Sequence, residues 1–158
     1  MDYTQPPNLT ESEIDSFLEK APIARICTLN KDGTIHAAPV WFRYRHGKIV
    51  FGTPTRSRKA RNLRRDDRIT ALIDVEGPPT RGVIVYGRAE MKMSGLEQAV
   101  WIFSKYMKPE RAATYAKGLL GISKWVQVDI VPDHMGSFDY AKDRTYFDAV
   151  DGGEAEDT

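Results

Sequence analysis

The sequence predicts a mainly β, α+β protein in which six antiparallel strands form a small barrel with a few peripheral helices. Runs rich in β-branched and aromatic residues are separated by short turns such as Asp32–Gly33 and His46–Gly47, a pattern typical of hairpins. Few helical segments lie between these runs, so a parallel α/β sheet is not indicated. Neither GxGxxG nor GxxxxGK[ST] occurs, which argues against a Rossmann or P-loop site.

The N-terminal part is predicted to contain a flexible lead-in followed by one short helix. Residues 1–9 include two consecutive prolines, which block regular structure. Thr10 and Glu13 form a capping-box pattern, which marks the start of a helix. The helix is predicted over 10–20 because apolar residues follow at helical spacing, namely Ile14, Phe17 and Leu18.

An antiparallel meander is predicted next, with strands over 23–29, 34–44 and 48–53. Pro39 lies in the second strand and cannot donate a ladder hydrogen bond, so it marks an edge or a bulge. Trp41 and Phe42 follow it. Neighbours on a strand point to opposite faces, so only one of the two can be core, and the other could form a stacking wall for a planar ligand.

The second half of the chain is predicted to alternate strands with helices. A basic helix over 57–65 is followed by strands over 68–75 and 81–93. Ser94 and Glu97 form a second capping-box pattern before an amphipathic helix. The last elements are a short helical piece from Pro109 that frays near Gly118 and Gly121, and a sixth strand over 125–131 that Pro132 ends.

Length and charge suggest one domain with an acidic extension. The 158 residues suit a single core, predicted over 10–147, and 41% hydrophobic with 28% charged residues is an ordinary globular composition. Residues 148–158 carry five acids and no base, so they are predicted to be a disordered acidic tail. Because the whole chain has a net charge of +1, the rest carries +6, which points to an anionic partner.

The expected location is cytoplasmic. The N-terminus has neither the basic nor the apolar region of a secretory signal. No apolar run approaches the roughly 20 residues that span a bilayer, so no membrane association is predicted. The single cysteine, Cys27, cannot form an internal disulfide and fits a reducing compartment.

The junction between the third strand and the basic helix is the strongest candidate site. The strand ends at Gly52-Thr53-Pro54, and Ser57 caps a helix start whose free N–H groups and dipole favour an anion. The hydroxyls of Thr53, Thr55 and Ser57 lie there beside the bases Arg58 and Lys59, which predicts a phosphate cradle. A solvated basic helix with an ordinary serine cap explains the same residues equally well.

Other chemistries have less support. The three histidines are scattered and no pair has metal-ligand spacing, so no protein-ligated metal is predicted. GxSxG is absent, which leaves nucleophilic catalysis without a motif. The bases of 56–68 could follow a nucleic-acid backbone, but acids interrupt them at Asp66 and Asp67, as on a plain solvated helix. No nucleic-acid partner is predicted.

Three segments resemble the pyridoxamine 5′-phosphate oxidase-like flavoproteins: PVWF at 39–42, IVFGTPTRSRKARNLRRDDR at 49–68 and RGVIVYGRAEM at 81–91. Within that group the chain is most similar to the flavin- and deazaflavin-dependent oxidoreductases of the split β-barrel fold. The resemblance covers about residues 10–142 and includes the order of the elements.

This resemblance implies a homodimer with the cofactor in a groove between subunits. It implies that Thr53, Ser57, Arg58 and Lys59 hold the cofactor phosphate. It also implies that the isoalloxazine ring lies along Pro39, Val40, Trp41 and Phe42, and that Arg81 and Gly82 close the site from the partner subunit.

The implied function is a flavin- or deazaflavin-dependent oxidoreductase acting on a small organic substrate. FMN is the expected cofactor and deazaflavin coenzyme F420 the alternative, because further bases such as Arg61, Arg64 and Arg65 suit its oligoglutamate tail. The Arg-x-His element of the true oxidases is missing, so pyridoxine phosphate oxidation is not expected. The flavin would carry the hydride chemistry, and no catalytic residue is predicted. The alternative function is a non-catalytic flavin- or haem-binding carrier or sensor on the same fold.

Overall fold

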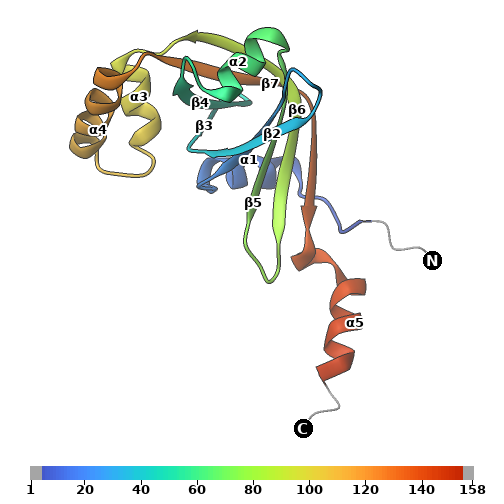
Figure 1. The fold of residues 1–158 in the computed structure, drawn as a ribbon. Coiled ribbons are helices and arrows are strands. Elements are labelled where there is room, and N and C mark those ends of the chain that lie inside the picture. Colours follow the sequence, from blue (N-terminus) through green and yellow to red (C-terminus); the bar gives the residue numbers. More distant parts are fainter. Residues whose placement is uncertain (1–4, 155–158) are drawn as a thin grey trace.

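One antiparallel sheet of seven strands organises the computed structural model, which describes residues 5–154 (Figure 1). The sheet order is β2-β1-β5-β6-β7-β4-β3, so β2 and β3 are edges and the barrel is not closed. The predicted fold class is confirmed. The strands are β1 Ala24–Leu29, β2 Ile35–Val40, β3 Arg43–Arg45, β4 Lys48–Pro54, β5 Arg68–Val75, β6 Arg81–Met93 and β7 Trp125–Asp139.

Five helices lie around this sheet. They are α1 Glu11–Lys20, α2 Arg58–Arg65, α3 Leu96–Phe103, α4 Pro109–Ile122 and α5 Arg144–Glu154, with a 3-10 turn at Tyr140–Lys142. Figure 1 shows α3 and α4 together on one side of the molecule and α5 at the end opposite α2. Among the described residues, no helix is long and apolar enough to cross a membrane.

The expected count of six strands is wrong, because the predicted strand 34–44 is two strands. β2 ends at Val40 and β3 begins at Arg43. Trp41 and Phe42 form a break between them, and the Phe42 N–H donates to the Tyr106 hydroxyl at 2.8 Å instead of to a neighbouring strand. A partner far along the chain therefore interrupts a segment whose local pattern is continuous.

The last strand also differs from its prediction, since Pro132 does not end it. β7 continues to Asp139 by means of a bulge against β6. Gly87 pairs with Pro132 and Tyr86 pairs with His134, which leaves one extra residue on β7. Proline is tolerated at such bulges because the ladder is already interrupted there.

Two of the three predicted helix starts have the expected N-cap, and the third does not. The Thr10–Glu13 capping box is confirmed, with both reciprocal bonds present, and Ser57 caps α2 through a bond from the Ala60 N–H. The Ser94–Glu97 box is wrong, because Gly95 is the N-cap of α3 and no side chain caps it. The short piece expected after Pro109 is a helix of 14 residues that includes both Gly118 and Gly121.

Two apolar clusters hold the fold together. The larger fills the barrel with side chains from all seven strands except the short β3, joined by Leu63 of α2 and by Phe17 and Leu18 of α1. The smaller lies between Val50 of β4 and the α3–α4 hairpin. Each fully buried aliphatic or aromatic side chain contributes about 1.5–3 kcal/mol of transfer free energy. The second cluster is what fixes the hairpin beside the end of β4.

Parts of the predicted lead-in and of the predicted tail belong to structured segments. Leu9 is buried and its N–H donates to the Ser137 hydroxyl, so the last part of the lead-in packs on β7. α5 runs to Glu154 and covers the first part of the predicted tail. Residues 1–4 and 155–158 lie outside the described residues, and the division into lead-in, domain and tail stays a prediction.

Candidate functional site

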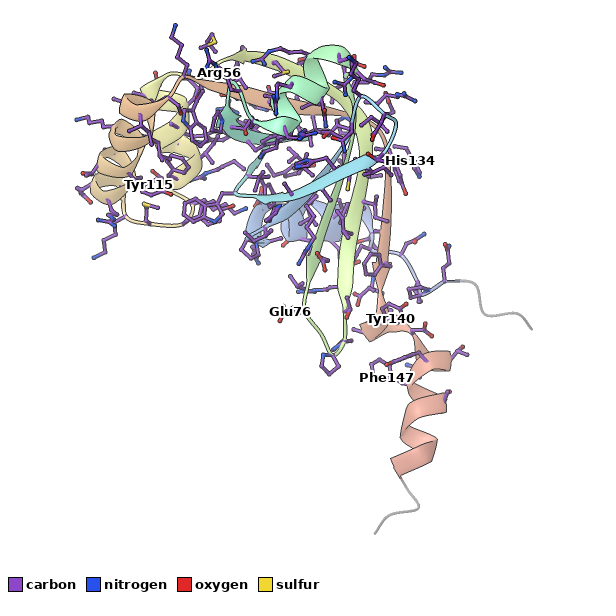
Figure 2. The ribbon with its side chains drawn as sticks, viewed as in Figure 1. Arg56, Glu76, Tyr115, His134, Tyr140 and Phe147 are labelled. Carbon is purple, nitrogen blue, oxygen red and sulfur yellow. The ribbon has the colours of Figure 1, made fainter. Side chains whose placement is uncertain are left out.

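A cavity of about 220 Å³ lies where β4, the β2–β3 break and the α3–α4 hairpin meet; we call it the Lys59 pocket. Five of the predicted site residues line it: Pro39, Val40, Trp41, Thr53 and Lys59. β2 and β4 are far apart in the sheet order, but the segment after β2 leads directly into β3, which pairs with β4 and so places the segment beside β4. Figure 2 shows Tyr115 of α4, another lining residue, on this side of the molecule.

One end of the pocket is cationic. Lys59 lines it from the first turn of α2, and burial lowers the pKa of its ammonium. Among the described residues no acid pairs with Lys59. The Thr53 hydroxyl donates to the Ser57 hydroxyl at 2.9 Å, and Ser57 in turn accepts the Ala60 N–H. A half-buried ammonium without a counter-ion, beside a helix start, is a site for an anion.

The other end is aromatic. Trp41 contacts Phe103 edge-on with ring centroids 5.9 Å apart, and Phe103 contacts Tyr115 in the same way at 5.0 Å. The outer side of Trp41 is stacked on Tyr106 at 4.6 Å. Rings held in this way form a wall against which a planar ligand can lie.

The floor of the pocket contains Gly52 and Trp125. A Cβ at Gly52 would meet Trp125 Cε3 at 3.4 Å, so the indole lies directly against the glycine. The Trp125 Nε1 is buried and has no hydrogen-bond partner among the described residues. An unsatisfied buried donor beside a cationic, aromatic pocket fits a ligand that carries acceptor atoms. The residues present therefore fit a planar anionic group such as a flavin phosphate ester.

Trp41 and Phe42 divide between pocket and core as the alternation argument requires. Phe42 has no exposed surface and belongs to the barrel core, whereas Trp41 is half-buried and lines the pocket. The prediction that only one of the two is core is confirmed. Phe42, which was expected along the isoalloxazine ring, therefore does not line the pocket.

Arg58 lies apart from Lys59. It lines a second cavity of about 240 Å³ on another face of α2, the basic groove, together with Lys31, Arg61, Asn62 and Arg65. The α2 members are spaced i, i+3, i+4 and i+7, which places them on one side of the helix. Asn62 anchors that side to β1 and the turn after it. Its side-chain amide donates to the Thr28 hydroxyl and to the Asn30 side-chain oxygen Oδ1, at 3.0 Å each.

Arg81 and Gly82 are also remote from the Lys59 pocket of their own chain. Arg81 begins β6 and its guanidinium lies 5.7 Å from the centre of the Phe17 ring of α1. A Cβ at Gly82 would come within 2.8 Å of the Ile73 carbonyl oxygen and of Phe138, so the glycine serves close packing. Their role toward a partner subunit stays a prediction.

Several pocket residues were not predicted from sequence. Phe103 was expected only as part of an amphipathic helix, and Tyr115, Leu119 and Trp125 were not singled out at all. Their spacing carries no motif, because each comes from an element that is placed by tertiary packing. Trp125 pairs with Pro54, and its ring lies against Gly52 two residues earlier on β4, a contact that the sequence pattern does not indicate.

Fold and pocket together define an open antiparallel barrel with a cation-ended, aromatic-walled cavity. The family model described as pyridoxamine 5′-phosphate oxidase matches residues 10–117, which is more than half of the chain. The chain belongs to the pyridoxamine 5′-phosphate oxidase family. No curated protein sequence matches it significantly.

Solved structures agree with this membership. The chain is 28% identical to the conserved hypothetical protein Rv2991 from Mycobacterium tuberculosis, with a TM-score of 0.76 over 89% of this chain and 92% of that chain. An FAD-binding protein from Mesorhizobium loti is 18% identical, with a TM-score of 0.63 over 83% and 95%. A protein named F420 reductase is also 18% identical, with a TM-score of 0.60 over 80% and 98%. The last two share the fold with this chain.

Proposed function

We propose that the protein is an oxidoreductase that binds a flavin-type cofactor, FMN or F420, in the Lys59 pocket and acts on a small organic substrate. The observation that carries this proposal is the pairing of a half-buried lysine without a counter-ion with a wall of aromatic rings in one cavity. That pairing suits a ligand with a planar ring system at one end and a phosphate at the other. Family membership and the names of the structural relatives support the same reading.

The lysine and the aromatic rings of the pocket would have separate roles in binding the cofactor. Lys59 would hold the phosphate by a charge-assisted bond, which contributes on the order of 1.5–3 kcal/mol. The Trp41 ring would orient the ring system, and the α3–α4 hairpin would keep water from it. The cofactor, when bound, supplies the hydride chemistry.

FMN and F420 differ in whether a part of the cofactor would contact the basic groove. FMN has one phosphate, so Lys59 and the hydroxyls near it suffice. F420 also has an oligoglutamate tail, and the basic groove offers Lys31 together with Arg58 and Arg61 of α2. FMN is the first candidate, and the basic groove is the observation that favours F420 as the second.

A non-catalytic carrier on the same fold is the alternative function. No Asp, Glu, His or Cys lines the Lys59 pocket among the described residues. Among the described residues, the titratable residues of the lining are Lys59 and Tyr115, and a pocket without an acidic residue or a histidine is compatible with a protein that binds a flavin and does not turn over a substrate. Turnover, not binding, separates this alternative from the oxidoreductase.

The proposal includes a homodimer. Cavities for cofactors usually measure roughly 300–1,000 Å³, and the Lys59 pocket of one chain is smaller. The outward face of β2, β1, β5, β6 and β7 carries a cross-strand row of partly or fully exposed residues without Lys, Arg, Asp or Glu, namely Ala37, Cys27, Thr70, Tyr86 and His134. The exposed Pro39 lies on the same face and also lines the pocket, so a second copy on this face would reach the pocket rim.

The test is equilibrium binding of FMN, riboflavin and F420 to the purified full-length protein, followed by reduction with a hydride donor. The proposal expects saturable binding of FMN or F420 and electron transfer from the reduced cofactor to an acceptor. A protein that binds neither cofactor would contradict the proposal. Binding without any turnover would leave the carrier function.

A further inference from the structure

The β2–β3 break at Trp41–Phe42 is held by the segment that joins α3 to α4. Residues in a break lose their sheet partners, and buried backbone groups need replacements. Two adjacent side chains from that segment, Lys105 and Tyr106, supply them.

Tyr106 contacts both residues of the break. Its hydroxyl accepts the Phe42 N–H at 2.8 Å and donates to the Pro22 carbonyl at 2.8 Å, with the Phe42 carbonyl at 3.0 Å as a second acceptor. Burial raises the pKa of this hydroxyl to about 12, so it stays protonated. Its ring is stacked on Trp41 with an interplanar angle of 13°. One side chain thus fixes the Phe42 backbone and the Trp41 ring together.

Lys105 reinforces the same point. Its Nζ donates to the Ala21 carbonyl at 2.7 Å and to the Phe42 carbonyl at 3.2 Å, and it lies 3.8 Å from the centre of the Phe42 ring. These two bonds need only two N–H groups, so the neutral amine can also make them, although the ammonium makes them more strongly. Neither Lys105 nor Tyr106 lines the Lys59 pocket.

We propose that Tyr106 and Lys105 are positioning residues that set the place of the Trp41 wall, so that the α3–α4 hairpin controls ligand binding in the Lys59 pocket. The ligand part of this inference rests on the proposed function. The mechanical part does not, because it concerns bonds within the chain. Any partner or substrate that displaces the hairpin would move Trp41 through these contacts, which gives the site a means of regulation.

The variant Tyr106→Phe tests whether these contacts hold Trp41 in place. It carries little risk to the fold, because it keeps the ring and removes only the hydroxyl. Tyr44→Phe is the matched control, since its hydroxyl donates to Asp15 of α1 at 2.7 Å and not to the break. Lys105→Met is the second test variant, with Lys142→Met as its control, because Lys142 pairs with Glu13.

The first readout needs no ligand. The chain has three tryptophans, so labelling with 5-fluorotryptophan gives three fluorine resonances, with Trp125 as an internal reference. The Trp41 resonance is expected to shift or broaden in Tyr106→Phe and not in Tyr44→Phe. An unchanged Trp41 resonance in Tyr106→Phe and Lys105→Met would overturn the inference.

The second readout is FMN affinity. Loss of one buried hydrogen bond predicts about 3- to 10-fold weaker FMN binding in Tyr106→Phe, and no change in Tyr44→Phe. Equal losses in both variants would mean a general loss of stability and would overturn the positioning role. A wild-type protein that binds neither FMN nor F420 would instead refute the proposed function. The fluorine resonances would still decide whether Tyr106 and Lys105 hold Trp41 in place.

Discussion

At the scale of single residues, burial gives two lysines different roles. Burial lowers the pKa of both Lys59 and Lys105, and for Lys105 the nearby Arg43 lowers it further. Lys105 meets backbone carbonyls within the chain, whereas Lys59 faces a cavity without an acid. The first is therefore a structural donor, and the second is free to hold an anion.

Lys105 predicts a pH-dependent stability. Its pKa falls from the ordinary 10.5 to about 8 in the folded protein, so the unfolded chain binds more protons between these values. The free energy of unfolding should therefore gain a contribution that rises with pH across this window. Urea unfolding of wild type and Lys105→Met from neutral to alkaline pH measures it. The difference should move in favour of wild type as pH rises, and a difference that is constant or moves the other way would refute the shift.

At the scale of elements, the α3–α4 hairpin and the β2–β3 break form one unit. The hairpin packs on Val50 of β4 through the smaller apolar cluster, and its connecting segment bonds to the break. The β4 side and the β2–β3 side of the pocket therefore both depend on the hairpin. A change that loosens α3 or α4 should affect ligand binding before it affects the barrel core.

Two glycines, one at the β6–β7 bulge and one in α4, should respond oppositely to alanine. A Cβ at Gly87 would lie 2.2 Å from the Val131 carbonyl oxygen at the bulge, so Gly87→Ala should cost about 1–3 kcal/mol. Gly118 lies in the middle of α4 with open space around its Cβ position, so Gly118→Ala should add roughly 0.5–1 kcal/mol. Urea denaturation measures both changes. Destabilisation of the same size by both would contradict the bulge and the length of α4.

Local patterns sufficed to predict most strands and the first two helices, because alternation, turns and caps act between near neighbours. The break at Trp41–Phe42 could not be predicted, since its partner Tyr106 is 64 positions away from Phe42. Continuation of β7 past Pro132 depends on a bulge against β6. A phosphate cradle could be proposed from residue types, and that proposal stays a prediction. Which of Arg58 and Lys59 meets the cavity could not, because the packing of Ala60 and Leu63 sets the rotation of α2.

At the scale of the whole molecule, the open sheet leaves large apolar side chains exposed on its outward face. Ile35 and Tyr86 are 69% and 45% exposed on outward-facing positions, and a monomer would leave them in water. Figure 2 shows His134, the last residue of the cross-strand row, on the side of the molecule away from Tyr115. A second copy packed over this row would bury the face, and obligate homodimers bury more than about 2,000 Å² in this way.

The dimer is tested by sedimentation of the purified chain, whose monomer mass is 17.9 kDa. Wild type should sediment as a dimer, and Tyr86→Glu should shift the protein toward monomer because it places a charge in the interface. Ile122→Glu is the control, since Ile122 is 82% exposed at the end of α4, away from this row. A wild-type monomer, or two variants that behave alike, would argue against this face as the interface.

The central claim is that Lys59 holds the phosphate of a cofactor in the Lys59 pocket. The direct measurement is the affinity of Lys59→Met for FMN and for riboflavin, which lacks the phosphate, with Arg58→Met as the matched neighbour. We expect Lys59→Met to weaken FMN by roughly 10- to 150-fold and riboflavin hardly at all. Arg58→Met should leave FMN almost unchanged, because Arg58 lines the basic groove instead. Equal losses for FMN and riboflavin in Lys59→Met, or none for either, would contradict the account.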